Sequence, residues 1–516
     1  MKRSVSDGFM RAKFKNVASW EQAHRRTITI VAIMLTLAIF SAICWHNAGR
    51  WSMWFDESFG GFMMRFNIVD IVRYTGADVH PPLYYLLLKG WVTLFGGSVV
   101  AVRAMSILFG AAAIVVGYLL ARRLAGPRAG YLSLPLLALS PMLLRYGFEG
   151  RMYTLMLLLA LLATYAFLVA CQSKTKKSWT IYAVLIALGL WTHYFFALVF
   201  VAHWLWWVVQ QFGTGARGHE LIGKIMSKEW RRVNLIVFLS YLPWIPVVVG
   251  QFSSVQGGFW IAPISADTMP NYLTKSLFYL NHGEVKSWLA MLLIAIAVLF
   301  LVMMVKAFRT TKKPSRAELG PLLSVAATPV MLLMLMSLPP LQPSFIERYL
   351  VPSIVMLSIL VAIVSSVKLR AIGAKVLQFT FLVMVMVAFS IGVINVVRLG
   401  NKTDLDTKAL MQTISTKSSE QEIVIANNSM LFYSLAMHES DQNPVRILDE
   451  NLEKNWGSTQ MIRDQAWRIV GQHDLAPGTR VWYISISGAT EPPRNDWTLT
   501  RELDIPGATA REYQVL

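Results

Sequence analysis

Long apolar runs recur along the chain between residues 27 and 397. Each run is close to the ~20 residues that an α-helix needs to cross the hydrocarbon core of a bilayer. The pattern therefore predicts a polytopic α-helical membrane protein with about eleven transmembrane helices. Their expected ranges are 27–45, 101–121, 129–145, 152–171, 179–193, 195–211, 233–250, 287–305, 319–338, 349–367 and 376–397.

Two of the outward-facing segments between these helices are much longer than a turn. The segment 46–100 holds an apolar run from His80 to Phe95 that has a helical period but is short for a span. We therefore expect interfacial helices in this loop. The segment 251–286 has turn residues at 256–258 and is expected to be a loop that can cover a cavity.

The pattern changes near Arg398, where short alternating runs replace the long apolar ones. Strands are expected at 422–427, 445–450 and 480–486, a helix at 429–438, and a terminal strand pair at 497–505 and 510–516. The chain thus divides into a basic N-terminus (1–26), a membrane domain (27–397) and a small C-terminal α/β domain (398–516). The last domain has no Gly-rich phosphate loop and no Ser-His-Asp signature, so an accessory role beside the cavity is expected.

The distribution of charge predicts the orientation of the chain. The formal net charge is +19, yet residues 398–516 hold 12 Lys and Arg against 16 Asp and Glu. Basic clusters occupy every second short loop of the membrane domain, which places the N-terminus in the cytoplasm. An odd number of helices then places the C-terminal domain outside an inner (cell) membrane. Membrane lipids are expected partners, whereas nucleic acid is not, because the soluble part is acidic.

Ionisable residues near the ends of the expected helices converge on the extracytoplasmic side. They are Asp56, Glu57, Asp78, His80, Arg103, Arg145, Glu149, Arg151, His193, Glu347 and Arg348. Charged groups at such positions are costly and commonly mark a substrate path or site. A carboxylate offers a general base for a hydroxyl group, and Arg or His side chains can bind the phosphate of a lipid-linked donor.

Five segments together resemble a known family. They are WFDES (54–58), DVHPPLYYLLLKGW (78–91), YGFEGRMYTLMLLLALLATY (146–165), GLWTHYF (189–195) and SFIERYLVPS (344–353). In this order they resemble the GT-C glycosyltransferases of family 39 and related type, which include protein O-mannosyltransferases and the aminoarabinose transferase of lipid A. The resemblance covers residues 27–370 and implies a GT-C-like membrane domain.

The resemblance also implies an enzyme that transfers a sugar from a polyprenyl-phosphate donor to a hydroxyl of a cell-envelope acceptor, with inversion at the anomeric carbon. Asp56 matches the family's catalytic base, and Glu57 matches a second acid that orients the acceptor or the loop. Arg348 and Arg151 match arginines that face the donor phosphate. His80 stands where some relatives carry Lys, which makes it a candidate phosphate ligand.

Further residues are expected to line the substrate cavity. They are Tyr84, Arg145, Glu149, Tyr153, His193, Tyr194 and Glu347. These motifs do not determine which sugar is transferred, or whether the acceptor is a glycan, a lipid or a protein. No cofactor is expected to be required. The acids of WFDES can approach His80 and His193, but no local spacing of ligands supports a metal site.

Each assignment has a simpler alternative. The acids of WFDES suit a solvated turn, and the two arginines suit contacts with lipid head groups. His80 suits a hydrogen bond at a helix start, His193 a bond to a backbone carbonyl, and Glu149 an ion pair with Arg145 or Arg151. For the whole chain the alternatives are a transporter or flippase of a lipid-linked precursor, and a scaffold. A transporter should show ionisable residues along a path through the membrane, whereas a transferase should gather them at the outer face.

Overall fold

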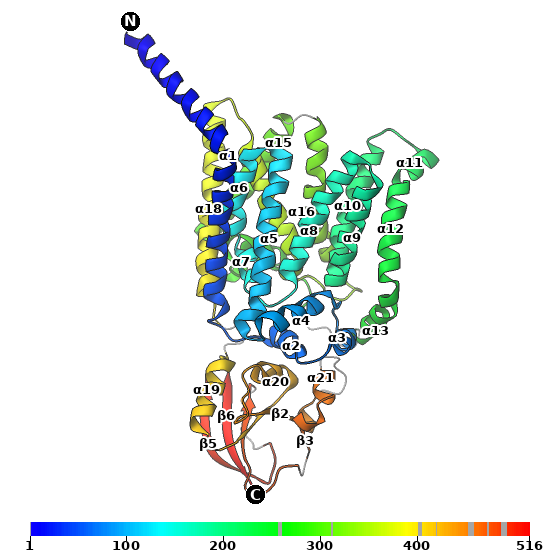
Figure 1. Cartoon of the computed structure of the whole chain (residues 1–516), viewed down its shortest axis with the longest axis vertical. Helices are drawn as coiled ribbons and strands as arrows, with labels where there is room; N and C mark the ends of the chain where they lie inside the picture. The colour runs from blue at the N-terminus through cyan, green and yellow to red at the C-terminus, as the bar shows by residue number, and fades with distance from the viewer. Residues whose placement is uncertain are drawn as a thin grey trace.

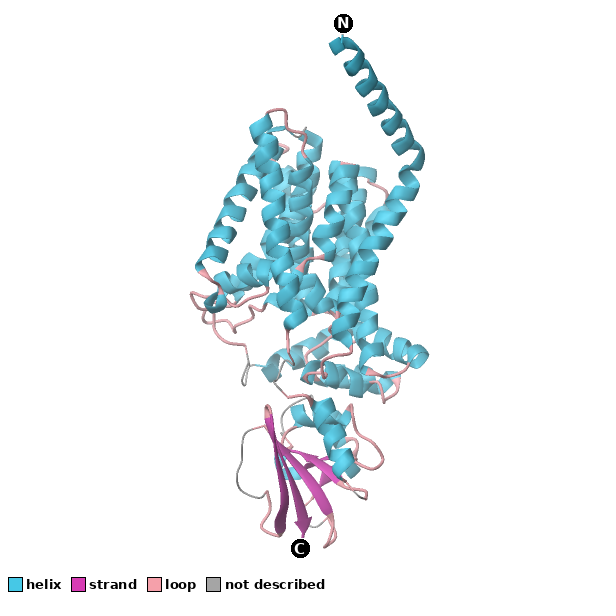
Figure 2. Cartoon of the chain, turned by 90° about the vertical axis from the view of Figure 1, so that its left-hand side faces the viewer, coloured by secondary structure: helices cyan, strands magenta, loops and turns pink. Residues whose placement is uncertain are grey.

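The structure, a computed structural model, describes residues 2–255, 261–310, 313–400, 405–418, 420–452, 459–471, 474–486 and 493–516. Long helices form a bundle, and a small α/β domain lies at one end of it, next to the C-terminus (Figures 1 and 2). The N-terminus lies beyond the opposite end of the bundle. We call the end next to the α/β domain the domain-side end. The turn residues expected at 256–258 lie outside the described residues.

Nine helices in the described part of the chain are long and apolar enough to span a membrane. They belong to α1 (Lys2–Ala48), α5 (Val99–Ala125), α8 (Tyr153–Ser173), α10 (Ala197–Phe212), α12 with α13 (Lys228–Tyr241 and Ile245–Val255), α15 (Ser287–Thr310), α16 (Lys313–Met336), α17 (Val351–Ser366) and α18 (Ile372–Arg398). The expectation of a multi-pass helical membrane protein is confirmed, although the number of eleven spans is not.

The two remaining expected spans are shorter helices of the same bundle. The span expected at 129–145 is divided into α6 (Pro127–Ala138) and α7 (Pro141–Gly147). Pro141 has no amide hydrogen with which to continue the helix, so the chain restarts there. The span expected at 179–193 is α9 (Lys176–Thr192), which has 17 residues. α6 packs along α5, and α9 packs along α8 (Figure 1).

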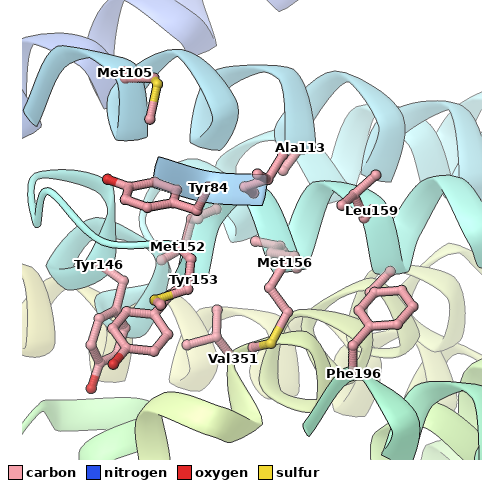
Figure 3. Packing of buried hydrophobic residues seen from close by; sticks show 14 of the residues in the cluster. Tyr84, Met105, Ala113, Tyr146, Met152, Tyr153, Met156, Leu159, Phe196 and Val351 are labelled. Carbon is pink, nitrogen blue, oxygen red and sulfur yellow. The ribbon is translucent and has the colours of Figure 1, made fainter. Parts of the chain in front are cut away.

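α8 and α17 form the centre of the bundle. Their most apolar stretches are 72% and 89% buried by protein, against 17% for α15. A helix that is apolar on all sides is expected at such a central position. Figure 3 shows part of this core, where Met156 of α8, Val351 of α17 and Phe196 of the short helix η1 (Tyr194–Phe196) lie in one cluster. η4 (Glu347–Leu350) leads into α17 and carries the ERYL segment.

Three helices of the first long loop lie across the domain-side end (Figure 1). They are α2 (Phe55–Met63), α3 (Ile68–Ala77) and α4 (Leu83–Phe95). α4 has 13 residues, too few to span a bilayer, and Pro82 precedes it, as expected for the interfacial helix. α2 has Asp56 and Glu57 in its first turn, where carboxylates face the positive end of the helix dipole. Two further helices complete the membrane part: α11 (Gly218–Ile225) and α14 (Thr268–Phe278).

The C-terminal domain contains a six-stranded sheet of order β3-β2-β1-β4-β6-β5 in its described part. β3, β2, β1 and β4 pair in parallel, whereas β4, β6 and β5 pair antiparallel. The elements are α19 (Thr407–Lys417), β1 (Ile423–Ala426), α20 (Ser429–Ala436), β2 (Val445–Leu448), α21 (Gln460–Arg463), β3 (Ile469–Val470), β4 (Arg480–Ser485), β5 (Trp497–Ile505) and β6 (Ala508–Val515). The expected α/β domain is confirmed, whereas α19, α21 and β3 were not predicted.

The C-terminal domain is docked on the helices of the first long loop. The Tyr433 ring of α20 lies against Phe59 and Phe62 of α2, with centroids 5.5 and 5.2 Å apart. Rings of this size bury a large apolar area and dominate such contacts. The domain therefore covers the helix that carries Asp56. Ion pairs join the same surfaces: Arg65 with Glu439, and Arg73 with Asp464.

Candidate active site

The buried charged side chains of the bundle gather at its domain-side end. Among the described residues before 400, the buried Asp, Glu, Lys, Arg and His residues are Glu57, Arg103, Arg145, Glu149, Arg151, His193, His203 and Arg348. All except His203 lie in loops or helix ends at the domain-side end. His203 lies within α10 and is hydrogen-bonded to Thr164 and Tyr182. The charges therefore form one cluster at one face, and the described residues show no charged path through the bundle.

Asp56 begins α2, and its carboxylate lies between two arginines. Oδ2 is 3.6 Å from Nη1 of Arg348 and 3.9 Å from Nη2 of Arg151. Both distances exceed the length of a direct hydrogen bond, which is about 2.7–3.2 Å. The Asp56 side chain is 20% exposed, whereas those of Arg348 and Arg151 are 9% and 2% exposed. An accessible acid thus lies beside two buried positive charges.

Hydrogen bonds hold Arg151 in place. Its Nη1 donates to the backbone carbonyl of Asp56 at 3.0 Å and to the Tyr85 hydroxyl at 2.9 Å. Its Nη2 lies 3.1 Å from Nε2 of His80. Nε is buried and has no hydrogen-bond partner among the described residues. A buried donor without a partner costs free energy unless a ligand or water accepts its hydrogen bond. Arg151 is therefore held in place and keeps its Nε–H available for a ligand.

His80 is held between Asp78 and Arg151. Because an arginine side chain only donates hydrogen bonds, Nε2 of His80 accepts from Arg151. Nδ1 then carries the hydrogen, which it donates to Oδ2 of Asp78 at 2.8 Å. Burial raises the pKa of the Asp78 carboxyl, but the hydrogen bond from His80 and the nearby positive charge of Arg151 lower that pKa below its usual value. Both ring nitrogens of His80 are thus engaged, and a phosphate entering the site would meet Arg151 first.

Arg348 lies among aromatic rings. Its guanidinium carbon is 5.5 Å from the ring centre of Trp54, 5.9 Å from that of Tyr153 and 5.7 Å from that of Tyr349. Aromatic faces attract a cation and exclude water from it. Trp54 and Tyr349 were not predicted as site residues, although Trp54 belongs to the motif WFDES and Tyr349 to the segment ERYL.

His193 lies at the corner between α9 and η1 and joins this cluster. Its ring centre is 6.1 Å from that of Tyr153 and 6.3 Å from that of His80. Nδ1 accepts a hydrogen bond from the backbone N–H of Phe195 at 3.2 Å, where a carbonyl partner was expected. Burial, together with the nearby positive groups, lowers the pKa of His193 well below its usual value. The imidazole is therefore neutral at neutral pH and adds no charge to the site.

Glu57 forms a buried ion pair that joins four segments. Its carboxylate accepts hydrogen bonds from Nε and Nη2 of Arg103, both at 2.8 Å, and from the backbone N–H of Gly150 at 2.7 Å. Arg103 also donates to the backbone carbonyls of Ala48 and Trp51. Both side chains are 3% exposed. Of the two expected roles for Glu57, this geometry supports the one that orients the loop.

Two further ion pairs border the cluster. Nη1 of Arg145 is 2.7 Å from Oε2 of Glu149, which is one of the two pairings expected for this glutamate. Nζ of Lys275 donates to Oε1 of Glu347 at 2.6 Å. Lys275 was not predicted, because α14 carries none of the motifs and only tertiary packing brings it to Glu347.

Tyr84 and Tyr194 lie at the margins. Tyr84 is fully buried against Tyr85, with ring centres 5.6 Å apart, so it packs the wall behind Arg151. Tyr194 donates its hydroxyl to Gln251 and accepts from Nε1 of Trp244 at 3.0 Å. These two partners line a separate cavity between α3 and α13. Tyr194 is therefore not brought to Asp56.

A cavity of about 280 Å³ adjoins the cluster. Its wall includes Trp54, Glu57, Arg103 and Arg145. A second cavity of about 460 Å³ lies beside it, since the two share Tyr279, Leu399 and Gly400. The second is lined by Lys275 and Arg398. The two together form a polar, cation-rich groove from WFDES towards α14 and α18.

No group of three or more His, Cys, Asp or Glu side chains is placed to hold a metal ion in the part of the chain that the structure describes. Asp56 faces the arginines, and Glu57 is bound to Arg103. That no cofactor is required stays a prediction.

Comparisons with known proteins show which family and which solved structures this chain is similar to. A family model described as dolichyl-phosphate-mannose-protein mannosyltransferase matches residues 79–244. ArnT from Cupriavidus metallidurans in the apo state matches with a TM-score of 0.62 at 12% identity, over 95% of this chain and 98% of that chain. The chain is thus similar to this mannosyltransferase family over about a third of its length, and it has the fold of ArnT, a GT-C glycosyltransferase, over nearly all of it. The resemblance to GT-C glycosyltransferases is thus confirmed, and three of the five motifs, at 78–91, 146–165 and 189–195, lie within or overlap the matched residues.

Two further solved structures have a similar fold. ArnT bound to undecaprenyl phosphate matches with a TM-score of 0.60 at 11% identity, over 94% of this chain and 98% of that chain. The oligosaccharyltransferase of Archaeoglobus fulgidus matches with a TM-score of 0.51 at 12% identity, over 83% of this chain and 65% of that chain. No curated protein matches the sequence significantly. Because these identities are low, the substrates are argued below from the geometry of the site itself.

Proposed function

We propose that this protein is a GT-C glycosyltransferase that transfers a sugar from a polyprenyl-phosphate donor to a hydroxyl group of a cell-envelope acceptor at the extracytoplasmic face of the inner membrane. The acceptor is a glycan, a lipid or a protein. The observation that carries the proposal is the position of the accessible Asp56 carboxylate, 3.9 and 3.6 Å from the buried Arg151 and Arg348. Buried guanidinium groups suit a phosphate, and the adjoining acid suits removal of a proton. ArnT, of the same fold, binds undecaprenyl phosphate, which supports this class of donor.

In the proposed mechanism the donor phosphate binds Arg151 and Arg348, whose charges stabilise it as the leaving group. The phosphate competes with Asp56 for the two arginines and leaves the carboxylate to accept the proton of the acceptor hydroxyl. The acceptor oxygen then forms a bond to the anomeric carbon as the bond from that carbon to the phosphate oxygen breaks. Attack from the face opposite to the phosphate inverts the anomeric centre. His80 acts through Arg151, which it holds in orientation.

The same arrangement argues against a transporter. A transport path requires polar or ionisable groups at successive depths of the membrane. In the described bundle the buried Asp, Glu and Arg residues lie at the domain-side end, and the buried histidine away from it, His203, is hydrogen-bonded to Thr164 and Tyr182. One cluster at one face favours transfer of a group at that face.

The proposal is tested by incubating the purified full-length protein with polyprenyl-phosphate sugars and a cell-envelope extract. We expect transfer of a labelled sugar to a component of the extract. Asp56→Asn keeps the size and hydrogen bonding of the side chain but removes proton acceptance, so transfer should fall by about a hundredfold or more. Donor binding should persist. Transfer at the parental rate by Asp56→Asn would reject the base assignment.

Arg348→Ala separates donor binding from chemistry. The change removes a charge-assisted contact worth about 1.5–3 kcal/mol, so the donor should bind roughly ten- to a hundredfold more weakly. Binding of a fluorescent or radiolabelled polyprenyl-phosphate sugar measures this directly. Parental affinity in Arg348→Ala would make this arginine a head-group contact only.

A further inference from the structure

A separate cavity opens at the end of the bundle opposite to the candidate active site. It has a volume of about 440 Å³ and lies between α6, α17 and α18. Three cations line it: Arg128 in the first turn of α6, Lys368 after α17, and Lys375 in the first turn of α18. None of the described residues that line it carries a carboxylate. The three charges are therefore not neutralised by acids of the cavity wall.

A buried polar group points to a ligand independently of these charges. Ser365 lines the cavity and is 2% exposed, and its hydroxyl has no hydrogen-bond partner among the described residues. Most buried hydroxyls in proteins find a partner, and one that does not is commonly completed by a bound molecule. Gln378 also lines the cavity, and its Nε2 donates to the carbonyls of Val364 and Val367 at 3.1 and 2.9 Å. These bonds fix α18 against the end of α17 and make the wall of the cavity rigid.

Two helix ends add to the positive potential. α6 begins at Pro127 and α18 at Ile372, and neither has a side-chain hydrogen bond at its N-cap. The free N–H groups and the dipole at a helix N-terminus favour an anion. Phe379 and Leu382 form the apolar side of the cavity, and Phe379 is 69% exposed on the surface of α18. The cavity is thus cationic at the helix ends and apolar along the face of a membrane-spanning helix.

We propose that this cavity binds the head group of an anionic phospholipid in the leaflet opposite to the active site. The phosphate lies between Arg128, Lys368 and Lys375 and accepts the hydrogen bond of Ser365, while the acyl chains follow Phe379 and Leu382. Basic pockets between transmembrane helices at the membrane surface recognise such lipids. A free phosphate group would use the same cations but not the apolar wall. The site does not depend on the transfer reaction proposed above.

The test compares lipid binding by purified full-length variants in neutral detergent, with native mass spectrometry to count retained lipids. Phosphatidylglycerol and phosphatidylcholine are the two probes. We expect the parent protein to retain phosphatidylglycerol preferentially. Lys368→Gln with Lys375→Gln should weaken phosphatidylglycerol binding by about fivefold for each charge removed. Arg370→Gln is the matched control, because Arg370 lies in the same exposed loop but does not line the cavity.

Further measurements distinguish a phospholipid head group from free inorganic phosphate as the bound anion. Ser365→Ala keeps every charge, so it should fold normally and still bind phosphatidylglycerol about fivefold more weakly. Excess inorganic phosphate should not displace the lipid from the parent. Complete displacement by inorganic phosphate would replace the lipid site with a small-anion site. Equal binding of both lipids, or equal losses in Arg370→Gln and in the Lys368 and Lys375 variant, would overturn the proposal.

Discussion

The two acids of WFDES are adjacent in sequence and have different environments. Successive residues of a helix point about 100° apart, so Asp56 and Glu57 face different neighbours. Asp56 is one-fifth exposed beside two arginines at distances above hydrogen-bond length. Glu57 is buried and accepts hydrogen bonds from Arg103 and Gly150. We therefore expect substitution of the two acids to act on different properties of the protein.

Glu57→Gln should lower stability more than it lowers chemistry. The change leaves the buried Arg103 without its counter-charge, and breaking a buried pair in this way costs about 3–5 kcal/mol. Thermal unfolding of the purified variant measures the loss. Glu347→Gln is the control, because its pair with Lys275 is more exposed, and surface pairs are worth about 0–1 kcal/mol. A stable Glu57→Gln variant that has lost transfer would instead place Glu57 in the reaction.

At the scale of elements, α2 is held from two sides. The bundle fixes its first turn through Arg151 and Arg103, and the C-terminal domain fixes its later turns through α20. The Tyr433 ring lies against both Phe59 and Phe62. The position of Asp56 therefore depends on packing contributed by a domain that supplies no member of the charged cluster.

Tyr433→Ala should loosen this contact. Removal of a buried aromatic side chain leaves a cavity, and a small displacement of a catalytic group is enough to lower the rate by about tenfold to a hundredfold. We expect transfer to fall while donor binding to the arginines persists. Leu499→Ala is the control, because Leu499 is exposed on the edge strand β5. An unchanged transfer rate in Tyr433→Ala would show that α2 is positioned by the bundle alone.

At the scale of the whole molecule, two ends of one bundle carry different chemistry. The domain-side end holds paired charges around a groove, whereas the opposite end holds Arg128, Lys368 and Lys375 around the proposed lipid cavity, whose described wall carries no carboxylate. The N-terminus lies beyond that opposite end (Figure 1). The positive-inside rule predicts that the basic end faces the cytoplasm and that the groove faces the opposite side of the membrane.

Cysteine labelling tests this orientation. Asp441 is exposed in the C-terminal domain, and Lys177 is exposed at the opposite end. When the outer face of the inner membrane is accessible and that membrane is intact, a membrane-impermeant maleimide should label Asp441→Cys. The same reagent should label Lys177→Cys only after the inner membrane is permeabilised. The parent chain, with Cys44 and Cys171, gives the background. Labelling of Lys177→Cys alone would reverse the topology and remove the proposed extracytoplasmic site.

The amino-acid sequence was sufficient to predict those helices and strands that depend on the residues within each segment. Apolar length predicts most of the spanning helices, because a bilayer imposes that length on any helix that crosses it. Alternation predicts the main strands of the C-terminal domain. The motifs predict that Asp56, Arg151 and Arg348 belong to one site, since each carries a family pattern. The break at Pro141 was missed, because the apolar pattern continues on both sides of it.

Tertiary structure alone decided which of these groups meet. Glu57 meets Arg103, 46 residues away, and Lys275 meets Glu347, 72 residues away. No local period encodes such contacts, because they depend on how the bundle packs and on where its helices end. His80 was expected at the phosphate, yet Asp78 and Arg151 take both of its nitrogens. Spacing along the chain predicts which types of residue lie at the domain-side end. The partner of each buried charge is fixed only in the folded protein, because a charge that is removed from water must be paired to avoid a large cost in free energy.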